Sequence, residues 1–173
     1  ASIGGILRKD FQNVYDLNAN FVRTGHRPAH PLMLLMADRL GIGIWEEIPV
    51  YWFGSRELDY QRTVRPVARQ MFLEMIARDL NRPSILVWGA CNECGAQQER
   101  SEFIRDLRDH ARKFDESRLI AQSAAGNDAF DKTQQVAHRH FDVFQDDLRR
   151  IRCPDAVLVL VSPSLKSFRP LLN

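Results

Sequence analysis

The sequence lacks several features that would assign it to a class at once. None of its apolar segments approaches the run of about 18 residues that spans a bilayer, and its amino terminus has no charged-then-apolar leader pattern. Its three cysteines are too few, and odd in number, for a dedicated disulfide framework. We therefore expect a soluble protein with no membrane partner, and a reducing compartment such as the cytoplasm is favoured.

A strong excess of one charge is also missing. The chain has 24 Lys and Arg against 22 Asp and Glu, which are interspersed along it and leave a net charge of +2. There is no basic stripe of the kind that follows a phosphate backbone, so nucleic acid is not expected as a partner. The content of 45% hydrophobic and 27% charged residues is ordinary for a globular domain. Without repeats or linkers, residues 1–173 are treated as a single domain.

The predicted elements alternate between helices and apolar strands, which implies a parallel sheet wrapped by helices. The spacing of apolar residues and the positions of Gly and Pro predict helices at 10–18, 31–40, 68–80 and 103–114, and strands at 20–24, 42–45, 84–90 and 119–121. Residues 50–63 are expected to form a long loop. Further along, a helix at 136–151 and a buried strand at 156–161 fit the pattern.

The dipeptide Asn92-Glu93 follows the apolar strand predicted at 84–90. This puts an amide and a carboxylate at the carboxyl end of a buried parallel strand, where α/β barrels carry their catalytic residues. In isolation such a dipeptide more often ends a strand and caps the next helix. Its context therefore decides its meaning.

That context resembles glycoside hydrolase family 2, the group of β-galactosidases and β-glucuronidases. Three segments carry the resemblance: LNANFVRTGH at 17–26, ADRLGIGIWEEIP at 37–49, and the stretch 75–93 that ends in Asn92-Glu93. Their order and spacing match the middle of the family's catalytic barrel, and residues 126–173 match it poorly. Because a complete eight-stranded barrel takes about 250 residues, the resemblance implies an α/β fold that is a partial, incomplete TIM barrel.

The resemblance also implies hydrolysis of a β-glycosidic bond with retention, which requires two carboxylates about 5–5.5 Å apart. Glu93 resembles the family's acid/base, and Asn92 resembles the asparagine that binds a sugar hydroxyl. The family's nucleophile lies several strands later, whereas the last glutamate here is Glu116. We interpret the chain as a fragment or degenerate relative that keeps the acid and lacks the nucleophile. Weak or no activity toward β-glycosides is expected, without cofactor or metal.

Other candidates lie before Asn92. Arg23 and His26 resemble residues that line the family's sugar pocket. Strand alternation sends one of Glu46 and Glu47 toward the barrel mouth, and Glu47 is favoured. Glu47 could form a new acid/base pair with Glu93, but an ion pair with Arg23 is the preferred interpretation.

The three tryptophans divide by their positions in the predicted elements. Trp45 and Trp88 stand inside apolar strands and are expected in the core. Trp52 stands on a loop and is the candidate for contact with a ligand.

Two alternatives remain. The chain could be a half-barrel interaction module, whose open strand edges pair with a second copy to give a homo-oligomer. More weakly, Cys91 and Cys94 have the spacing of a redox or metal pair. The sequence has no second such pair. A zinc site would therefore need two further ligands, and Cys153 with His138 or His140 could supply them only if the fold happened to bring them close to Cys91 and Cys94.

Overall fold

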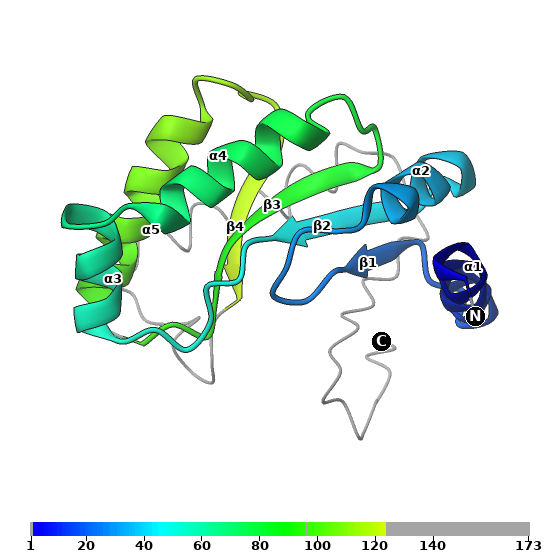
Figure 1. Cartoon of the computed structure of the whole chain (residues 1–173), viewed down its shortest axis with the longest axis horizontal. Helices are drawn as coiled ribbons and strands as arrows, with labels where there is room; N and C mark the ends of the chain where they lie inside the picture. The colour runs from blue at the N-terminus through cyan, green and yellow to red at the C-terminus, as the bar shows by residue number, and fades with distance from the viewer. Residues whose placement is uncertain (1, 96, 124–173) are drawn as a thin grey trace, which may run out of the picture.

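The computed structural model describes residues 2–95 and 97–123. Within them the four strands form one parallel sheet in the order β1-β2-β3-β4 (Figure 1). The elements follow one another as α1 (Ile3–Asp16), β1 (Phe21–Arg23), α2 (Pro31–Leu40), β2 (Gly43–Glu47), α3 (Ser55–Thr63), α4 (Val67–Asp79), β3 (Ile85–Asn92), α5 (Gln97–Ala111) and β4 (Leu119–Ser123). The predicted alternation is confirmed here. The helix and strand predicted at 136–151 and 156–161 lie outside the described residues.

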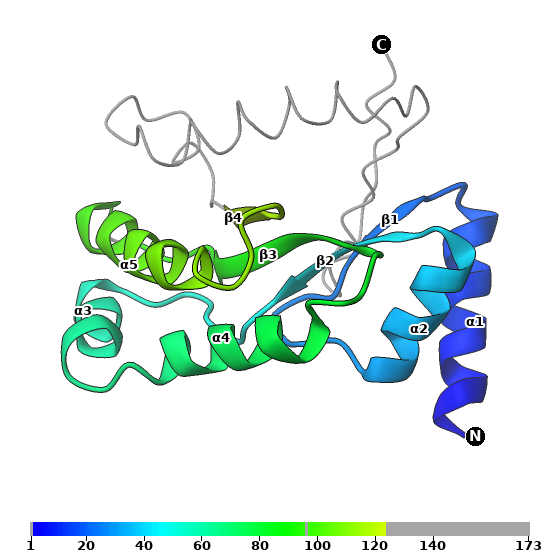
Figure 2. The same cartoon turned by 90° about the horizontal axis from the view of Figure 1, so that it is seen from above.

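Helices α2, α4 and α5 lie along one side of the sheet (Figure 2). The main hydrophobic core fills the space between these helices and the sheet, and it includes Ile44, Phe72, Trp88 and Leu107. A second, smaller cluster lies on the other face of the sheet, formed by Phe21, Trp45 and Val87 with Leu119 and Ala121 against them. Both faces of the sheet therefore bury apolar side chains, which explains why its strands read as nearly continuous apolar runs. Trp45 and Trp88 are buried as predicted.

Helix α2 begins and ends where the sequence predicts. Pro31 occupies its first position, where the missing N–H is not needed, and the His30 side chain accepts a hydrogen bond from the Leu32 N–H. Gly41 ends the helix in the left-handed conformation with φ 68°. Glycine adopts this conformation without the steric strain that a Cβ brings, so Gly41 fixes the turn into β2.

Two predictions for helices are wrong. Helix α1 begins at Ile3 and not at residue 10, because Ser2 caps it by accepting a hydrogen bond from the Gly5 N–H, while two early glycines weaken its helical signal. The region 50–63 is not one long loop, because it contains α3. Only Leu58 of this helix is buried, so its sequence shows little apolar periodicity.

Strand β3 carries an irregularity that matters for the site. Its residue Gly89 pairs with Ala121, but the next pair is Cys91 with Gln122, so one extra residue stands in β3 between the two pairs. Such a bulge reverses the alternation of side chains beyond it. Cys91 consequently joins the helix-side core, and Asn92 faces the other side of the sheet, where it meets Arg23.

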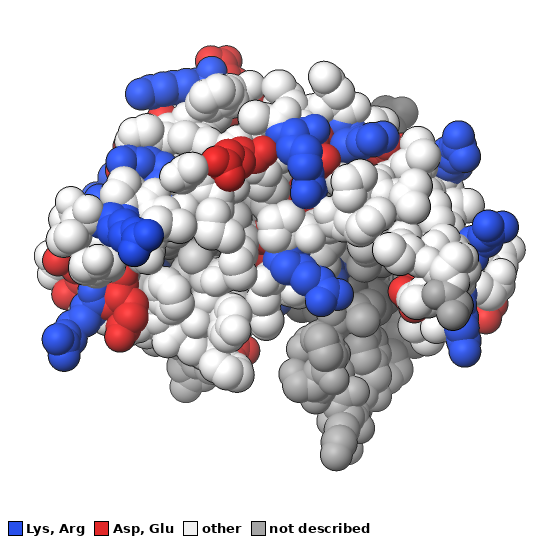
Figure 3. All heavy atoms as spheres, in the orientation of Figure 1, with Lys and Arg blue, Asp and Glu red and all other residues white. Residues whose placement is uncertain are grey.

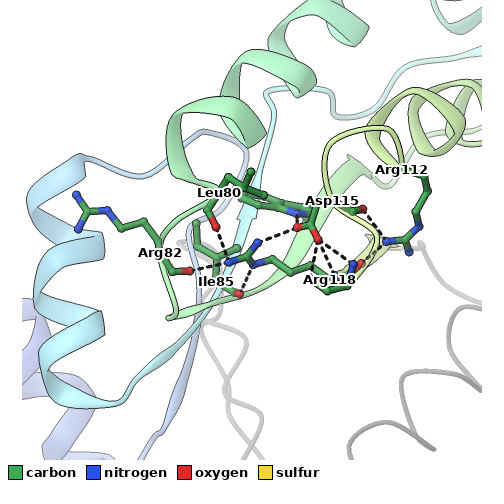
Figure 4. Close-up of polar contacts among 8 residues, drawn as sticks. Leu80, Arg82, Ile85, Arg112, Asp115 and Arg118 are labelled. Carbon is green, nitrogen blue, oxygen red and sulfur yellow. Dashed lines mark hydrogen bonds and ion pairs between the residues drawn. The ribbon is translucent and has the colours of Figure 1, made fainter.

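The amino ends of β3 and β4 are joined by a network of polar contacts around the largely buried ion pair of Asp115 with Arg118, which precedes β4 (Figure 4). The Arg118 guanidinium donates to the carbonyl oxygens of Leu80, Arg82 and Ile85. Asp115 accepts hydrogen bonds from the Trp88 indole, the Ser117 hydroxyl and backbone, and Arg118. This network lies at the end of the sheet opposite the candidate site, where barrel residues serve stability.

The surface carries both signs of charge. On the face in Figure 3, acidic and basic side chains are interspersed without a continuous basic tract on that face. No helix in the described part of the chain has the length and apolar character that crossing a membrane requires.

Candidate active site

Three polar side chains meet at the carboxyl ends of β1, β2 and β3. The Arg23 guanidinium donates to both oxygens of Glu47, from Nε to Oε2 at 2.8 Å and from Nη2 to Oε1 at 3.1 Å. Nη2 also donates to Asn92 Oδ1 at 2.7 Å. The relative exposures are 9% for Arg23, 1% for Glu47 and 5% for Asn92, so the cluster is shielded from water. Bidentate contact with a shielded carboxylate gives Arg23 a fixed orientation.

The amide of Asn92 is oriented by the same contact. A guanidinium can only donate hydrogen bonds, so the side chain oxygen of Asn92 must face Arg23. Its amide nitrogen is therefore turned away from Arg23 and can donate to another group.

Gly89 makes room for Glu47. These two residues are partners in the pairing of β2 with β3. A Cβ at Gly89 would clash with Glu47 Cβ and with Trp45 Nε1. This close approach requires a glycine in the middle of β3, and sequence reasoning missed it. The signal was available, since a glycine inside an apolar strand often marks a site where another group comes close.

Glu46 and Glu47 face opposite sides of the sheet. Glu47 joins Arg23 and Asn92, as the favoured interpretation of the sequence had it, and the ion pair with Arg23 is present. Glu46 lies on the helix side, where it accepts hydrogen bonds from the Ala29 N–H at 2.7 Å and from Arg78 at 3.0 Å. It is fully buried. Burial and the neighbouring Asp79 carboxylate raise the pKa of Glu46 to about 7.

We expect the stability of the protein to fall as the pH rises from about 4.5 to about 8. A carboxyl group whose folded-state pKa is raised above its ordinary value stabilises the fold below that ordinary value, and the contribution is lost as pH rises through the folded-state pKa, here about 7. The loss amounts to roughly 3–4 kcal/mol, since the pKa rises from 4.5 to about 7 and each pKa unit corresponds to about 1.4 kcal/mol. Urea unfolding at a series of pH values measures it.

The variant Glu46→Gln isolates this contribution, because its neutral amide still accepts the same hydrogen bonds. The difference in unfolding free energy between the wild type and Glu46→Gln should change across this pH range. Glu116→Gln, at an exposed position, is the control. The difference in unfolding free energy between the wild type and Glu116→Gln should stay constant across this pH range. A wild type and a Glu46→Gln variant with parallel pH profiles would contradict the assignment.

His26 is held over the same cluster. Its backbone N–H and its Nδ1 both contact Glu47 Oε1, the latter at 2.9 Å. The imidazole stacks on Tyr51 with ring centroids 5.1 Å apart. His26 has φ 50°, an uncommon conformation for a residue with a Cβ. The contact with Tyr51 was not anticipated from the sequence, because the two residues stand in different loops.

Glu93 lies at the exposed rim of this site. Its φ of 48° places it in the left-handed region, and its carboxylate accepts a hydrogen bond from the Trp52 indole at 2.8 Å. Trp52 is 70% exposed, in keeping with its expected place on the surface. The structure therefore places Arg23, Glu47 and Asn92 in one buried cluster, while a contact between Trp52 and Glu93 stands next to it.

Cys91 and Cys94 are buried free thiols, whose hydrogen-bond partners include the Gln122 side-chain oxygen for Cys91 and the Asn92 carbonyl oxygen for Cys94. The interaction of the two thiols with each other, together with burial, raises the pKa of Cys91 well above its usual value, and the same interaction lowers the pKa of Cys94. Within the two described ranges, His, Cys, Asp and Glu side chains form no group of three or more that could hold a metal ion. Cys153, His138 and His140 lie outside these ranges.

The fold and the site together define a class of protein. A parallel sheet of alternating strands and helices, with polar side chains gathered at the carboxyl ends of its strands, is part of an α/β barrel of the kind that carries its active site at this end. Comparison with known proteins gives the family. The model for the TIM barrel domain of glycosyl hydrolases family 2 matches residues 5–155, and the chain belongs to this family. The match extends past residue 126, further than the motifs that carried the resemblance.

Individual relatives agree. The chain is 35% identical to a β-glucuronidase of Paenibacillus borealis over 121 residues, which are 65% of this chain and 20% of the relative. It is 35% identical to a β-galactosidase of Thermoanaerobacterium thermosulfurigenes over 104 residues, 60% of this chain and 13% of the relative. Each alignment thus covers a fifth or less of the relative.

Solved structures show the same fold. β-Glucuronidase 3 of Bacteroides uniformis, in its apo form, superimposes with a TM-score of 0.60 at 31% identity, covering 70% of this chain and 16% of that one. The family 2 β-galacturonidase of Eisenbergiella tayi, bound to galacturonate, gives a TM-score of 0.65 at 25% identity, covering 72% and 22%. The predicted partial barrel and family are confirmed.

Proposed function

We propose that this chain forms the proton-donor side of the active site of a retaining β-glycosidase and lacks the attacking carboxylate, as a fragment or degenerate relative would. Glu93 is the acid that protonates the oxygen of the cleaved bond. The attack on the anomeric carbon requires a second carboxylate, and the sequence offers no glutamate after Glu116 to supply it. The substrate class is a β-glycoside, in line with the relatives named as β-glucuronidases and β-galactosidases.

The observation that carries this proposal is the hydrogen bond from Arg23 to Asn92. It joins β1 to β3 beside Glu47, and because it occupies the Asn92 side-chain oxygen, it leaves the amide nitrogen as the group that can donate to a sugar. A donor fixed in this way fits a sugar hydroxyl next to the bond that is cleaved, and such hydrogen bonds strengthen in the transition state. Glu47 neutralises Arg23, so in the described cluster Arg23 and Glu47 orient Asn92 and leave proton transfer to Glu93.

Binding of a glycoside to Asn92 tests the proposal without requiring turnover. We expect 4-nitrophenyl β-D-glucuronide or 4-nitrophenyl β-D-galactoside to bind the wild type. The substitution Asn92→Ala should raise the dissociation constant about tenfold, which corresponds to the loss of one hydrogen bond of about 1.4 kcal/mol. Asn13→Ala, at an exposed position of α1, is the matched control. Titration followed by NMR gives the constants. Equal affinity of the wild type and Asn92→Ala for whichever glycoside binds would overturn the role of Asn92.

A second role in assembly stays a prediction. Among the described strands, β1 pairs only with β2, and β4 only with β3, so each has one unpaired edge within this part of the chain. Unpaired edges favour pairing with another strand. A half-barrel module that forms a homo-oligomer through these edges is the alternative function.

A further inference from the structure

The loop after β2 reaches across to the end of β3 and places Trp52 against Glu93. The two residues are 41 positions apart in the sequence, and the Trp52 Nε1–H donates to Glu93 Oε2 at 2.8 Å. A hydrogen bond that a charged carboxylate accepts is among the stronger kinds in proteins. The contact therefore holds the side chain of Glu93 in one orientation.

The backbone supports this contact from both sides. Trp52 has φ 59° and Glu93 has φ 48°, and left-handed conformations are strained for residues other than glycine. Three backbone hydrogen bonds hold them in place: Trp52 N–H to Asn92 O at 3.0 Å, Asn92 N–H to Val50 O at 2.9 Å, and Glu93 N–H to Ser123 O at 2.8 Å. The pairing of the two segments thus imposes the strained geometry, and strain of this kind tends to occur at functional sites.

We propose that Trp52 is a positioning residue for Glu93, which fixes the oxygen that delivers the proton and forms a wall for the leaving group. The role rests on the proposed function of Glu93. Because an indole N–H can only donate, it occupies Oε2 as an acceptor and leaves Oε1 to carry the proton of the acid form. On proton transfer, the O–H bond at Oε1 breaks, the leaving oxygen gains the proton, and Glu93 becomes a carboxylate that the indole still stabilises.

The exposed ring of Trp52 gives the second half of the proposal. An acid must lie beside the oxygen between the sugar and its leaving group, so the group beyond that oxygen comes close to whatever holds the acid. Trp52 is 70% exposed, and its ring lies edge-on to the ring of Tyr51, with 5.6 Å between the ring centroids. The ring of Tyr51 in turn stacks on His26. This row of rings suits a flat or apolar leaving group, either an aryl group or the apolar face of a second sugar.

Hydrogen exchange of the indole N–H tests the positioning role in the full chain without any sugar. We expect Trp52 Nε1–H, assigned with the variant Trp52→Phe, to exchange about tenfold faster in Glu93→Ala than in the wild type, because its charged acceptor is lost. The indoles of Trp45 and Trp88 serve as internal controls, since their unchanged exchange shows that the fold is intact. Equal exchange of Trp52 in the two proteins would overturn the positioning role.

The wall is tested by comparing 4-nitrophenyl and methyl β-D-glycosides as ligands. The wild type should prefer the aryl glycoside by up to about tenfold, a contribution typical of aromatic contacts. Trp52→Ala should abolish this preference with little effect on the methyl glycoside, and Trp52→Phe should restore it, since phenylalanine keeps a ring but has no N–H. An aryl preference that survives in Trp52→Ala would overturn the wall. If neither glycoside bound, the proposed function and the wall would both fail, while indole exchange would still decide the positioning role.

Discussion

The chain is expected to hydrolyse 4-nitrophenyl β-D-glucuronide and 4-nitrophenyl β-D-galactoside at least about a thousandfold more slowly than a retaining glycosidase with both carboxylates, since losing one member of a catalytic pair costs several orders of magnitude. This expectation rests on the proposed function, in which Glu93 protonates the leaving oxygen and the carboxylate that attacks the anomeric carbon is missing. Glu47 is the other carboxylate in the candidate site, and its oxygens already form hydrogen bonds with Arg23 and His26. Release of 4-nitrophenol measures the rate.

The variants Glu93→Gln and Glu116→Gln complete this experiment. Any residual turnover that depends on the proposed acid should fall further in Glu93→Gln, because an amide cannot donate that proton, and it should be unchanged in Glu116→Gln. An ordinary enzyme turns over on the order of 10 times per second. If the wild type reached this rate and Glu93→Gln abolished the turnover, the proposal that the nucleophile is missing would be wrong.

Replacing Asp115 by alanine should destabilise the fold by about 3–5 kcal/mol, because removing one member of a buried ion pair leaves the other charge unpaired. Asp115 is 4% exposed. Its loss would leave the Trp88 indole N–H without this hydrogen-bond acceptor and the Arg118 guanidinium without its ion-pair partner (Figure 4). Burial alone would raise the pKa of Asp115, but the hydrogen bonds from Arg118, Trp88 and Ser117 outweigh burial and hold the pKa well below its usual range. The carboxylate is therefore charged in the folded protein at neutral pH.

Chemical unfolding with a matched control measures this loss. Asp109→Ala removes an aspartate that also pairs with an arginine, but the side chain of Asp109 is 57% exposed. Its effect should stay within about 0.5–1 kcal/mol, since exposed ion pairs contribute little. A thermal scan should show a decrease of about 10 °C for Asp115→Ala, given 2–4 °C per kcal/mol for a chain of this size. Similar losses for the two variants would show that the buried network does not stabilise the sheet.

The elements that could be predicted from sequence are those whose signals are local. A proline at the first position and a left-handed glycine after the last fix α2 at Pro31–Leu40, and both act through their own backbone geometry. Helix α3 escaped prediction because it buries one residue, Leu58, and its stability depends on packing against α4 and α5. Weak periodicity gives no local signal when tertiary contacts supply the stabilisation.

The site divides in the same way. Strand alternation is a local property, so it correctly separates Glu46 from Glu47. The contact of Arg23 with Asn92 depends on the bulge between Gly89 and Cys91, which turns Asn92 to the side of the sheet that uniform alternation would give to Cys91. Gly89 inside the apolar strand is compatible with a bulge, but the sequence does not place it, because a bulge is defined by pairing with β4.

By itself the sequence determined the family, the parallel α/β pattern and the candidate positions Arg23, Glu47, Asn92 and Glu93, because these follow from motifs and from the periodicity of neighbouring residues. Only the tertiary structure decided how their side chains are oriented: a guanidinium shared between Glu47 and Asn92, and an indole that binds Glu93 from a loop 41 residues away. The reason is that a hydrogen bond acts over about 3 Å, and such a distance between segments far apart in the chain is set by strand register, bulges and strained backbone, which no single stretch of sequence encodes.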